Sequence, residues 1–338
     1  MNPIDLAERG LVPDAAIRVA IRRLLRTRLS DERAGGPGAQ SERFMALIGE
    51  LSRSRIAIET DAANEQHYEV PAAFYQQVLG RHLKYSSAFW PEGVSGLDDA
   101  EAEMLALTAG RAGLADGQRI LELGCGWGSL TLWMAEKFPR AEITAVSNSA
   151  SQREWILARA GERGLANVDV LTRDVNELKL EPGFDRVVSV EMFEHVRNYR
   201  DLMQRIAGWL KPGGWLFVHV FCHRTLMYPF ETEGAGNWMG RHFFTGGLMP
   251  ASDTLLWFQD ALSIRHRWLI DGRHYARTAR AWLDNLDRNR DAVAASLDGQ
   301  PREQLQRWRM FFMACEELFA FRGGREWMVA HYRFERRA

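Results

Sequence analysis

The feature that most constrains the fold is a short apolar segment that ends in three closely spaced glycines. Residues 120–123 form the apolar run, Gly124, Gly126 and Gly128 follow it, and helical spacing begins at Ser129. Glycine accepts positive φ angles and, having no Cβ, lets a ligand approach the main chain. The pattern therefore predicts a buried strand, a tight turn and a helix N-terminus beside a ligand. The spacing is not that of a phosphate-binding loop. The alternative is an ordinary glycine turn in an α/β protein without a bound ligand.

Strand and helix patterns alternate from residue 117 onward, as an α/β sheet requires. The expected strands lie near 119–123, 142–147, 167–172, 184–190 and 214–220, and the expected helices near 129–138, 149–163 and 197–210. The alternation lapses after residue 222, where glycine, proline and aromatic residues are frequent, so we expect an inserted cap over the sheet. The elements expected to complete the chain are a strand near 263–270, helices near 274–294 and 301–321, and a strand near 326–334.

The first 60 residues are predicted to be helical. Residues 15–29 place apolar side chains roughly on one face and arginines on the others; these apolar residues are Ile17, Ile21, Leu24, Leu25 and Leu29. Such a basic amphipathic helix either packs on the main domain, which we expect, or lies on a membrane. The run from Gly35 to Gly38 interrupts the helical pattern and predicts a mobile link.

Composition favours a cytoplasmic globular protein. The formal net charge is −1, so no long-range attraction to nucleic acid or to an acidic membrane is expected. Cys125, Cys222 and Cys315 are isolated, which argues against a disulfide framework and a zinc cluster and fits a reducing compartment. No apolar run reaches membrane-spanning length, and the N-terminus lacks the apolar core of a signal peptide. We therefore expect no metal, no nucleic-acid partner and no membrane contact.

The glycine loop, with Glu122 two residues before its first glycine, resembles motif I of the class I methyltransferases. Those enzymes have a Rossmann-like α/β fold and bind S-adenosylmethionine (SAM). The resemblance implies a mostly parallel seven-stranded sheet, SAM as the methyl donor and S-adenosylhomocysteine (SAH) as its product. The chain is then expected to divide into an N-terminal helical region (1–60), a SAM-covering segment with helices (61–116), a SAM-binding core (117–222), a substrate cap (223–262) and closing strands and helices (263–338).

The end of the second predicted strand narrows the resemblance, because it lacks the acid that usually binds the SAM ribose. Ser147, Asn148 and Gln152 stand there instead, which is similar to the cyclopropane fatty acid synthase superfamily. A Tyr-Ser pair closes over SAM in that superfamily, and this role falls on Tyr85 and Ser86.

Asp174 and Val175 follow the third predicted strand, where Asp174 is the natural partner of the adenine amino group. A helix N-cap is the alternative role of this carboxylate. The cofactor contacts implied in all are Tyr85, Ser86, Glu122, Gly124, Gly126, Gly128, Ser147, Asn148, Gln152, Asp174 and Val175.

Two carboxylates and a histidine follow the fourth predicted strand, whose tip should face the methyl group of SAM. If the segment is helical, Glu191, Glu194 and His195 share one face, because they are spaced i, i+3 and i+4. An amine must lose a proton before its lone pair can attack a methyl group. Carboxylates can hold the ammonium form, and the unperturbed histidine pKa of about 6.5 suits proton transfer. A solvated strand end with a helix cap is the alternative.

A narrower resemblance begins in this region, to the coclaurine-type N-methyltransferases, which methylate tetrahydroisoquinoline amines. The stretches that carry it are V-E-M-F-E-H-V-R-N-Y at 190–199, L-F-V-H-V-F-C-H-R-T-L-M-Y-P-F-E at 216–231, F-F-T-G-G-L-M-P at 243–250 and H-R-W-L-I-D-G-R-H-Y-A-R-T at 266–278. The resemblance runs from about residue 55 to the end and assigns catalysis to Glu191, Glu194 and His195. The amine pocket that we expect, with core packing as the alternative for each aromatic, comprises Tyr68, His219, Tyr228, Phe230, Trp238, Phe244, Trp257 and Tyr275.

The rival hypothesis is modification of an unsaturated acyl chain, as in the cyclopropane synthases. Those enzymes hold a bicarbonate base with a Cys, a Glu, a His and a Tyr. The matching positions are Ser87, Glu194, His219 and Tyr275, so the cysteine is missing here. A SAM-binding protein without catalysis is a third hypothesis, which the cluster of charges disfavours because buried charge is costly. Nucleic-acid methylation has no support from a basic face. The sequence therefore predicts a SAM-dependent N-methyltransferase of a small aromatic or cyclic amine, for which a homodimer is a reasonable state.

Overall fold

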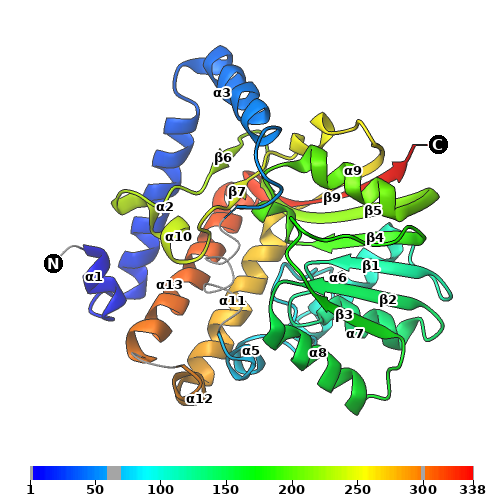
Figure 1. Cartoon of the computed structure of the whole chain (residues 1–338). Helices are drawn as coiled ribbons and strands as arrows, with labels where there is room; N and C mark the ends of the chain where they lie inside the picture. Colours follow the sequence, from blue (N-terminus) through cyan, green and yellow to red (C-terminus); the bar gives the residue numbers. More distant parts are fainter. Residues whose placement is uncertain (1–2, 59–69, 298–300, 338) are drawn as a thin grey trace.

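A seven-stranded, mostly parallel sheet forms the centre of the computed structural model, which describes residues 3–58, 70–297 and 301–337 (Figure 1). The strand order is β3-β2-β1-β4-β5-β9-β8. Only the pairings of β9 with β5 and β8 are antiparallel. The strand bounds are β1 Arg119–Leu123, β2 Glu142–Ser147, β3 Val168–Thr172, β4 Phe184–Val190, β5 Leu210–His223, β8 Leu262–Ile270 and β9 Trp327–Arg336. The predicted fold class is confirmed.

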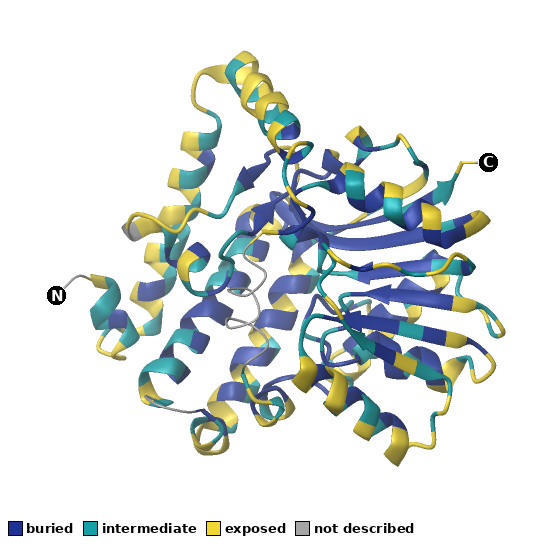
Figure 2. Cartoon of the chain, in the orientation of Figure 1, coloured by how far each residue is buried: buried dark blue, intermediate teal, exposed yellow. Residues whose placement is uncertain are grey.

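Helices cover both faces of the sheet, because its central strands are apolar on both sides. On one face Ile120 of β1 packs with α6 and α7, and on the other Leu121 and Leu123 pack with α9 and with α3 (Gly36–Leu51) of the N-terminal region. The flanking helices are α6 Leu97–Ala112, α7 Ser129–Lys137, α8 Ala150–Glu162 and α9 Tyr199–Trp209. Figure 2 shows the central strands of the sheet as mostly buried.

A second group of helices lies beside the sheet and has a core of its own (Figure 1). Its members are α1 Pro3–Glu8, α2 Asp14–Glu32, α5 Ala72–Val78, α11 Gly272–Arg288, α12 Arg290–Ala295 and α13 Pro301–Ala320. The single helix expected at 274–294 is two helices, with the break at Asn289. The helix α3 Gly36–Leu51 follows α2 with only a short turn.

The mobile link predicted at residues 35–38 is wrong. Gly35 has a φ of 80° and caps α3, which begins at Gly36 with a proline in its first turn. Proline and glycine mark a helix start here, because proline fits the first turn and glycine accepts the left-handed conformation.

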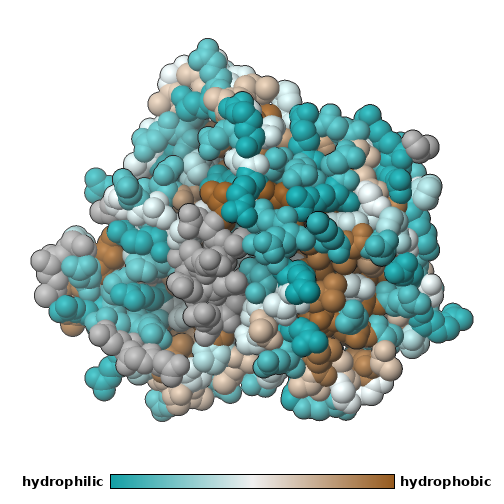
Figure 3. Space-filling view, viewed as in Figure 1, coloured by the Kyte–Doolittle hydropathy of each residue, from teal (hydrophilic) through white to brown (hydrophobic). Residues whose placement is uncertain are grey.

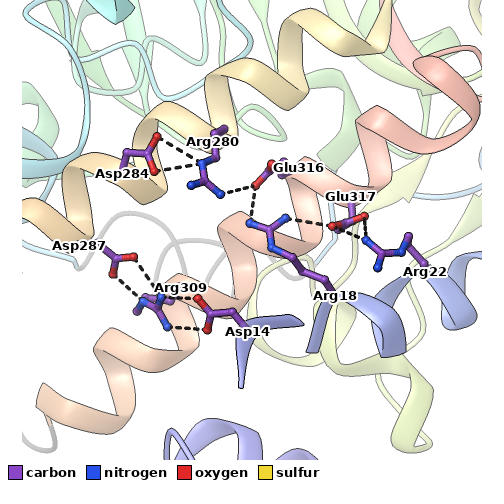
Figure 4. A network of polar contacts seen from close by, with 9 residues as sticks. All are labelled: Asp14, Arg18, Arg22, Arg280, Asp284, Asp287, Arg309, Glu316 and Glu317. Atoms are coloured by element: carbon purple, nitrogen blue, oxygen red, sulfur yellow. Dashed lines mark hydrogen bonds and ion pairs between the residues drawn. The ribbon is translucent and has the colours of Figure 1, made fainter. Parts of the chain in front are cut away.

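Ion pairs fix the basic helix α2 to α13, which is the packing that we expected for it (Figure 4). Arg18 binds Glu316 at 2.6 Å and Glu317 at 3.0 Å, and Arg309 bridges Asp14 of α2 (2.7 Å) and Asp287 of α11 (2.6 Å). Ile17 and Leu29 of α2 are buried against this group. Among helices of the described residues, none is both long and apolar enough to span a bilayer.

The predicted cap consists of short elements. Two short strands, β6 Tyr228–Pro229 and β7 Leu248–Met249, pair with each other, and α10 spans Trp238–His242. The 3₁₀ turns of the described chain are Phe193–His195, Ala235–Asn237, Thr254–Trp257 and Phe321–Gly323.

Arg309→Met should lower the free energy of unfolding by about 1–2 kcal/mol, because the change removes charged hydrogen bonds to two carboxylates but keeps the apolar stem. Arg265→Met is the matched control, since Arg265 pairs with Glu335 at 2.7 Å but is 54% exposed, and it should change stability by less than about 0.5 kcal/mol. Urea unfolding measures both values. Equal effects would show that the α2–α13 pairs contribute nothing beyond a surface pair.

Candidate active site

A cleft at the carboxyl ends of β1, β2 and β4 surrounds the glycine loop. Its two halves share Gly124, Gly126, Gln152, Met192 and His195 as lining residues. One half is also lined by Lys84, Tyr85, Ser86, Glu122, Glu191, Phe244 and Tyr275. The other half is also lined by Ala57, Ile58, Ser147, Asn148, Asp174 and Val175. On the face seen in Figure 3 the surface is mostly hydrophilic, and apolar residues show in several separate patches.

The three glycines of the loop have different physical roles. A Cβ on Gly126 (φ 52°) would meet no atom within 4 Å, so this residue leaves open space in the cleft. A Cβ on Gly124 would lie 2.7 Å from Met192, and one on Gly128 would lie 2.6 Å from Ile156. Gly128, predicted as a cofactor contact, does not line either half of the cleft and instead allows α7 and α8 to approach. The loop therefore presents bare backbone to a ligand mainly at Gly126.

Glu122 lies in the cleft on the face of β1 that packs with α7. Thr131 Oγ1 donates a hydrogen bond of 2.5 Å to Glu122 Oε2, and the side chain is almost fully buried. Burial raises the pKa of Glu122 to about 8. A bound ammonium group would oppose this rise, because an opposite charge stabilises the carboxylate.

Gln152 presents a donor that no described residue satisfies. Ser147 Oγ donates to Gln152 Oε1 at 2.7 Å, and this bond fixes the amide so that Nε2 is buried without an acceptor among the described residues. A buried unsatisfied donor is costly unless a ligand or water accepts from it. Gln152 lines both halves of the cleft, so its amide fits a ligand with hydroxyl or carboxylate oxygens.

Asp174 lines the cleft and caps a turn, not a helix. Its Oδ1 accepts from Asn176 N (2.7 Å) and Asn176 Nδ2 (2.8 Å), and no helix begins at this point. The helix N-cap considered for Asp174 is therefore wrong, although the side chain does hold a local turn.

Glu191 lies at the end of β4 with a φ of 47°, outside any helix. Its Oε1 accepts from Ser87 N at 2.8 Å and lies 3.1 Å from His219 Nε2, and its Oε2 accepts from Tyr275 Oη at 2.6 Å. Burial raises the pKa of this carboxyl, and the nearby Lys84 ammonium together with the Ser87 and Tyr275 donors opposes the rise. Several donors hold a carboxylate in one position and stabilise its charged form.

The expected shared helix face of Glu191, Glu194 and His195 is wrong. Only Phe193–His195 turns, as a single 3₁₀ turn, and the positive φ of Glu191 places it before that turn. Glu191 and His195 line the cleft, whereas Glu194 lies behind it. Glu194 is fully buried. Sequence periodicity does not report burial, so it could not separate Glu194 from the two residues that line the cleft.

The two remaining members of the triplet have pKa values shifted by burial. Burial and the charge of Arg197 lower the pKa of His195 to about 4, so its imidazole is neutral at pH 7. Glu194 Oε1 accepts from Phe221 N at 2.7 Å, while Oε2 has no partner among the described residues. Burial and the charge of Glu191 raise the pKa of Glu194.

Lys84 is a residue of the cleft that sequence reasoning missed. Its ammonium is buried and donates to Ser86 Oγ (2.5 Å) and to the Ser87 carbonyl oxygen (2.7 Å). Burial lowers its pKa to about 8. A lysine in a polar segment is normally solvated, so nothing in the sequence marks this one except its place next to Tyr85 and Ser86.

The predicted amine pocket is only partly assembled. Phe244 and Tyr275 line the cleft, and His219 is buried behind Glu191. Trp257 is 48% exposed and packs on Phe44, away from the cleft. Tyr68 lies outside the described residues.

Three cap aromatics line a different cavity, because α1 and α2 cover the cap and the aromatics fill the space between. Tyr228, Phe230 and Trp238 line this apolar cavity with residues of both helices. Phe230 stacks on Phe244 with ring centroids 5.0 Å apart, so this pair stands between the two cavities. Among the residues that the structure covers, no group of His, Cys, Asp or Glu has a metal-binding arrangement.

Comparisons with known proteins agree with this geometry. Residues 57–325 match the family model described as mycolic acid cyclopropane synthetase. The chain is 36% identical to (S)-coclaurine N-methyltransferase of Thalictrum flavum subsp. glaucum, over 98% of this chain and 94% of that protein. It is 26% identical to the cyclopropane-fatty-acyl-phospholipid synthase of Escherichia coli (strain K12), over 80% and 67%.

A solved structure of coclaurine N-methyltransferase, bound to N-methylheliamine and SAH, has the same fold. It superposes with a TM-score of 0.94 at 34% identity and covers 98% of both chains. The class I methyltransferase fold and the use of SAM by this chain follow from these similarities.

Gln152→Leu should weaken SAH binding by about 5- to 100-fold, because the substitution removes the donor that the buried site offers while keeping its volume. Gln118→Leu is the control, since the Gln118 side chain bonds to the main chain of its own loop, at Gly113 and Ala115, and does not line the cleft. Isothermal titration calorimetry measures both affinities. Unchanged binding in Gln152→Leu would remove this side chain from the cofactor site.

Proposed function

The chain belongs to the mycolic acid cyclopropane synthetase family, and we propose that it methylates the nitrogen of a small aromatic or cyclic amine of the tetrahydroisoquinoline kind, with SAM as the methyl donor. The observation that carries the proposal is the fixed carboxylate of Glu191 beside a neutral His195 in the cleft. An ammonium group needs such an anion, whereas an acyl chain has no charge for it to bind.

The cofactor site in this proposal is the half of the cleft with the polar strand ends. Gly126 leaves room for the ligand, Gln152 offers its free amide donor, and Ser147 orients that amide. Asp174 lines the same space, and Glu122, which lines the adjoining half of the cleft, would bind the amino group of SAM. Bound there, SAM supplies an electrophilic methyl group.

The residues of the chain then prepare the amine. Glu191 holds the ammonium form, and His195, whose imidazole is neutral at pH 7, accepts one of its protons. The amine lone pair forms the new N–CH₃ bond as the S–CH₃ bond breaks, and its electron pair stays on sulfur. The product leaves as a protonated amine with one more methyl group. Glu194, behind the cleft, supports the turn that carries His195.

The aromatic part of the substrate would contact Phe244 and Tyr275, which line the same half of the cleft. In this proposal the SAM-binding core is 117–222 and the cap at 223–262 supplies one wall of the amine site. The homodimer and the cytoplasmic location stay predictions.

Parallel assays with SAM, offering tetrahydroisoquinolines and an unsaturated phospholipid, test the acceptor class. We expect methylated amine, detected by mass spectrometry, and no change in the lipid. Transfer of a methylene group to the lipid with no amine turned over would reject the proposal in favour of the cyclopropane synthase chemistry.

His195→Ala should lower kcat for amine methylation by about 10²- to 10⁴-fold, the usual contribution of a proton-transfer group. SAH affinity should change little. His266→Ala is the control, because His266 is exposed on β8 and stacks on Trp268 outside the cleft. A His195→Ala enzyme with full activity at pH 7 would remove the histidine from the mechanism.

A further inference from the structure

A chain of four side chains leads from the cleft through the sheet to α6 on one of its faces. Glu191 Oε1 lies 3.1 Å from His219 Nε2, His219 Nδ1 lies 3.0 Å from His331 Nε2, and His331 Nδ1 lies 2.9 Å from Arg111 Nη1. The two histidines are fully buried. Buried polar groups need hydrogen-bond partners, and these bonds supply them for both rings.

Sheet register and helix position assemble this chain. His219 of β5 and His331 of β9 are directly paired across the antiparallel ladder, and β9 places His331 opposite Trp268 of β8. Arg111 comes from the last turn of α6 and lies over the Trp268 ring, with its guanidinium carbon 5.0 Å from the ring centroid. Four elements thus contribute to one line of hydrogen bonds.

The arginine at its end determines the direction of every bond. A guanidinium only donates, so His331 Nδ1 must accept, and the proton of this neutral ring must be on Nε2. His331 Nε2–H then donates to His219 Nδ1, which in turn leaves the His219 proton on Nε2, facing Glu191. Burial lowers the pKa of both histidines, with neighbouring positive charge lowering them further, so both rings are neutral.

We propose that Arg111 and His331 are positioning residues that, through His219, keep Glu191 a carboxylate with one fixed donor behind it. The proposal rests on the proposed function for the role of Glu191 towards the amine. The chain cannot carry a proton away, because arginine does not release one at physiological pH. The chain therefore orients the His219 donor and stabilises the charge of Glu191, and it does not conduct a proton out of the site.

Other titratable groups near Glu191 also set its charge. They are Lys84, Glu194, His195, His219, Tyr275 and Cys315. Lys84, the Ser87 amide and Tyr275 stabilise the carboxylate from the cleft side. The Arg111 chain adds the His219 donor, which shares Glu191 Oε1 with the Ser87 amide, while Tyr275 donates to Oε2.

Arg111→Met should move the acid limb of the kcat/KM profile for the amine upward by about one pH unit. Losing the arginine frees the histidines to change tautomer, and a carboxylate with a weaker donor has a higher pKa. Arg111→Lys should restore the limb, because lysine also only donates. Arg186→Met is the matched control, since Arg186 is another half-buried arginine over an indole, 4.1 Å from the Trp215 centroid, with no link to Glu191. A limb that moves equally in Arg186→Met, or not at all in Arg111→Met, would overturn the proposal.

A second measurement needs no substrate. ¹⁵N-imidazole NMR of the unmodified enzyme should show His219 and His331 as neutral Nε2–H tautomers from about pH 6 to 8. An Nδ1–H tautomer or an imidazolium at either position would overturn the proposal. Absence of amine turnover in the unmodified enzyme would reject the proposed function separately, because the tautomers are read without it.

Discussion

The carboxylate of Glu191 faces the cleft on one side, and the surrounding structure supplies hydrogen bonds that water would otherwise give it. Three donors reach it from three different elements: the segment before α6, strand β5 and helix α11. Bringing them together requires the sheet order, the docking of α11 beside the strand ends and the positive φ of Glu191 itself. A non-glycine residue in this conformation costs of order 1 kcal/mol, which the surrounding bonds must offset.

The same ring of donors clarifies how this chain relates to the cyclopropane synthases. The resemblance to those enzymes placed a bicarbonate base among positions matched by Ser87, Glu194, His219 and Tyr275. In this structure Ser87, His219 and Tyr275 all contact the carboxylate of Glu191. An anion belonging to the chain therefore lies where the resemblance implied a small free one.

Local pattern was enough to predict the sheet, because strand and helix periods and the glycine turn are properties of neighbouring residues. The five parallel strands and the three helices between them lie close to their predicted ranges. Contacts between distant residues were not predictable in this way. Arg111 and His331 are 220 positions apart, and only the sheet register brings them together.

The cap aromatics were misassigned for the same reason, since the pattern does not tell which helix covers Tyr228 or Trp238. Burial, which separates Glu194 from Glu191 and makes Lys84 unusual, is likewise a property of the complete fold.

Helix α13 connects the two ends of the chain. Glu316 and Glu317 on one side bind α2, while Phe311 on another lines the cleft, and His331 follows only a short distance later in β9. One helix therefore carries both the carboxylates that hold α2 and an aromatic side chain of the cleft wall. A displacement of α13 would move the N-terminal helices and this wall together.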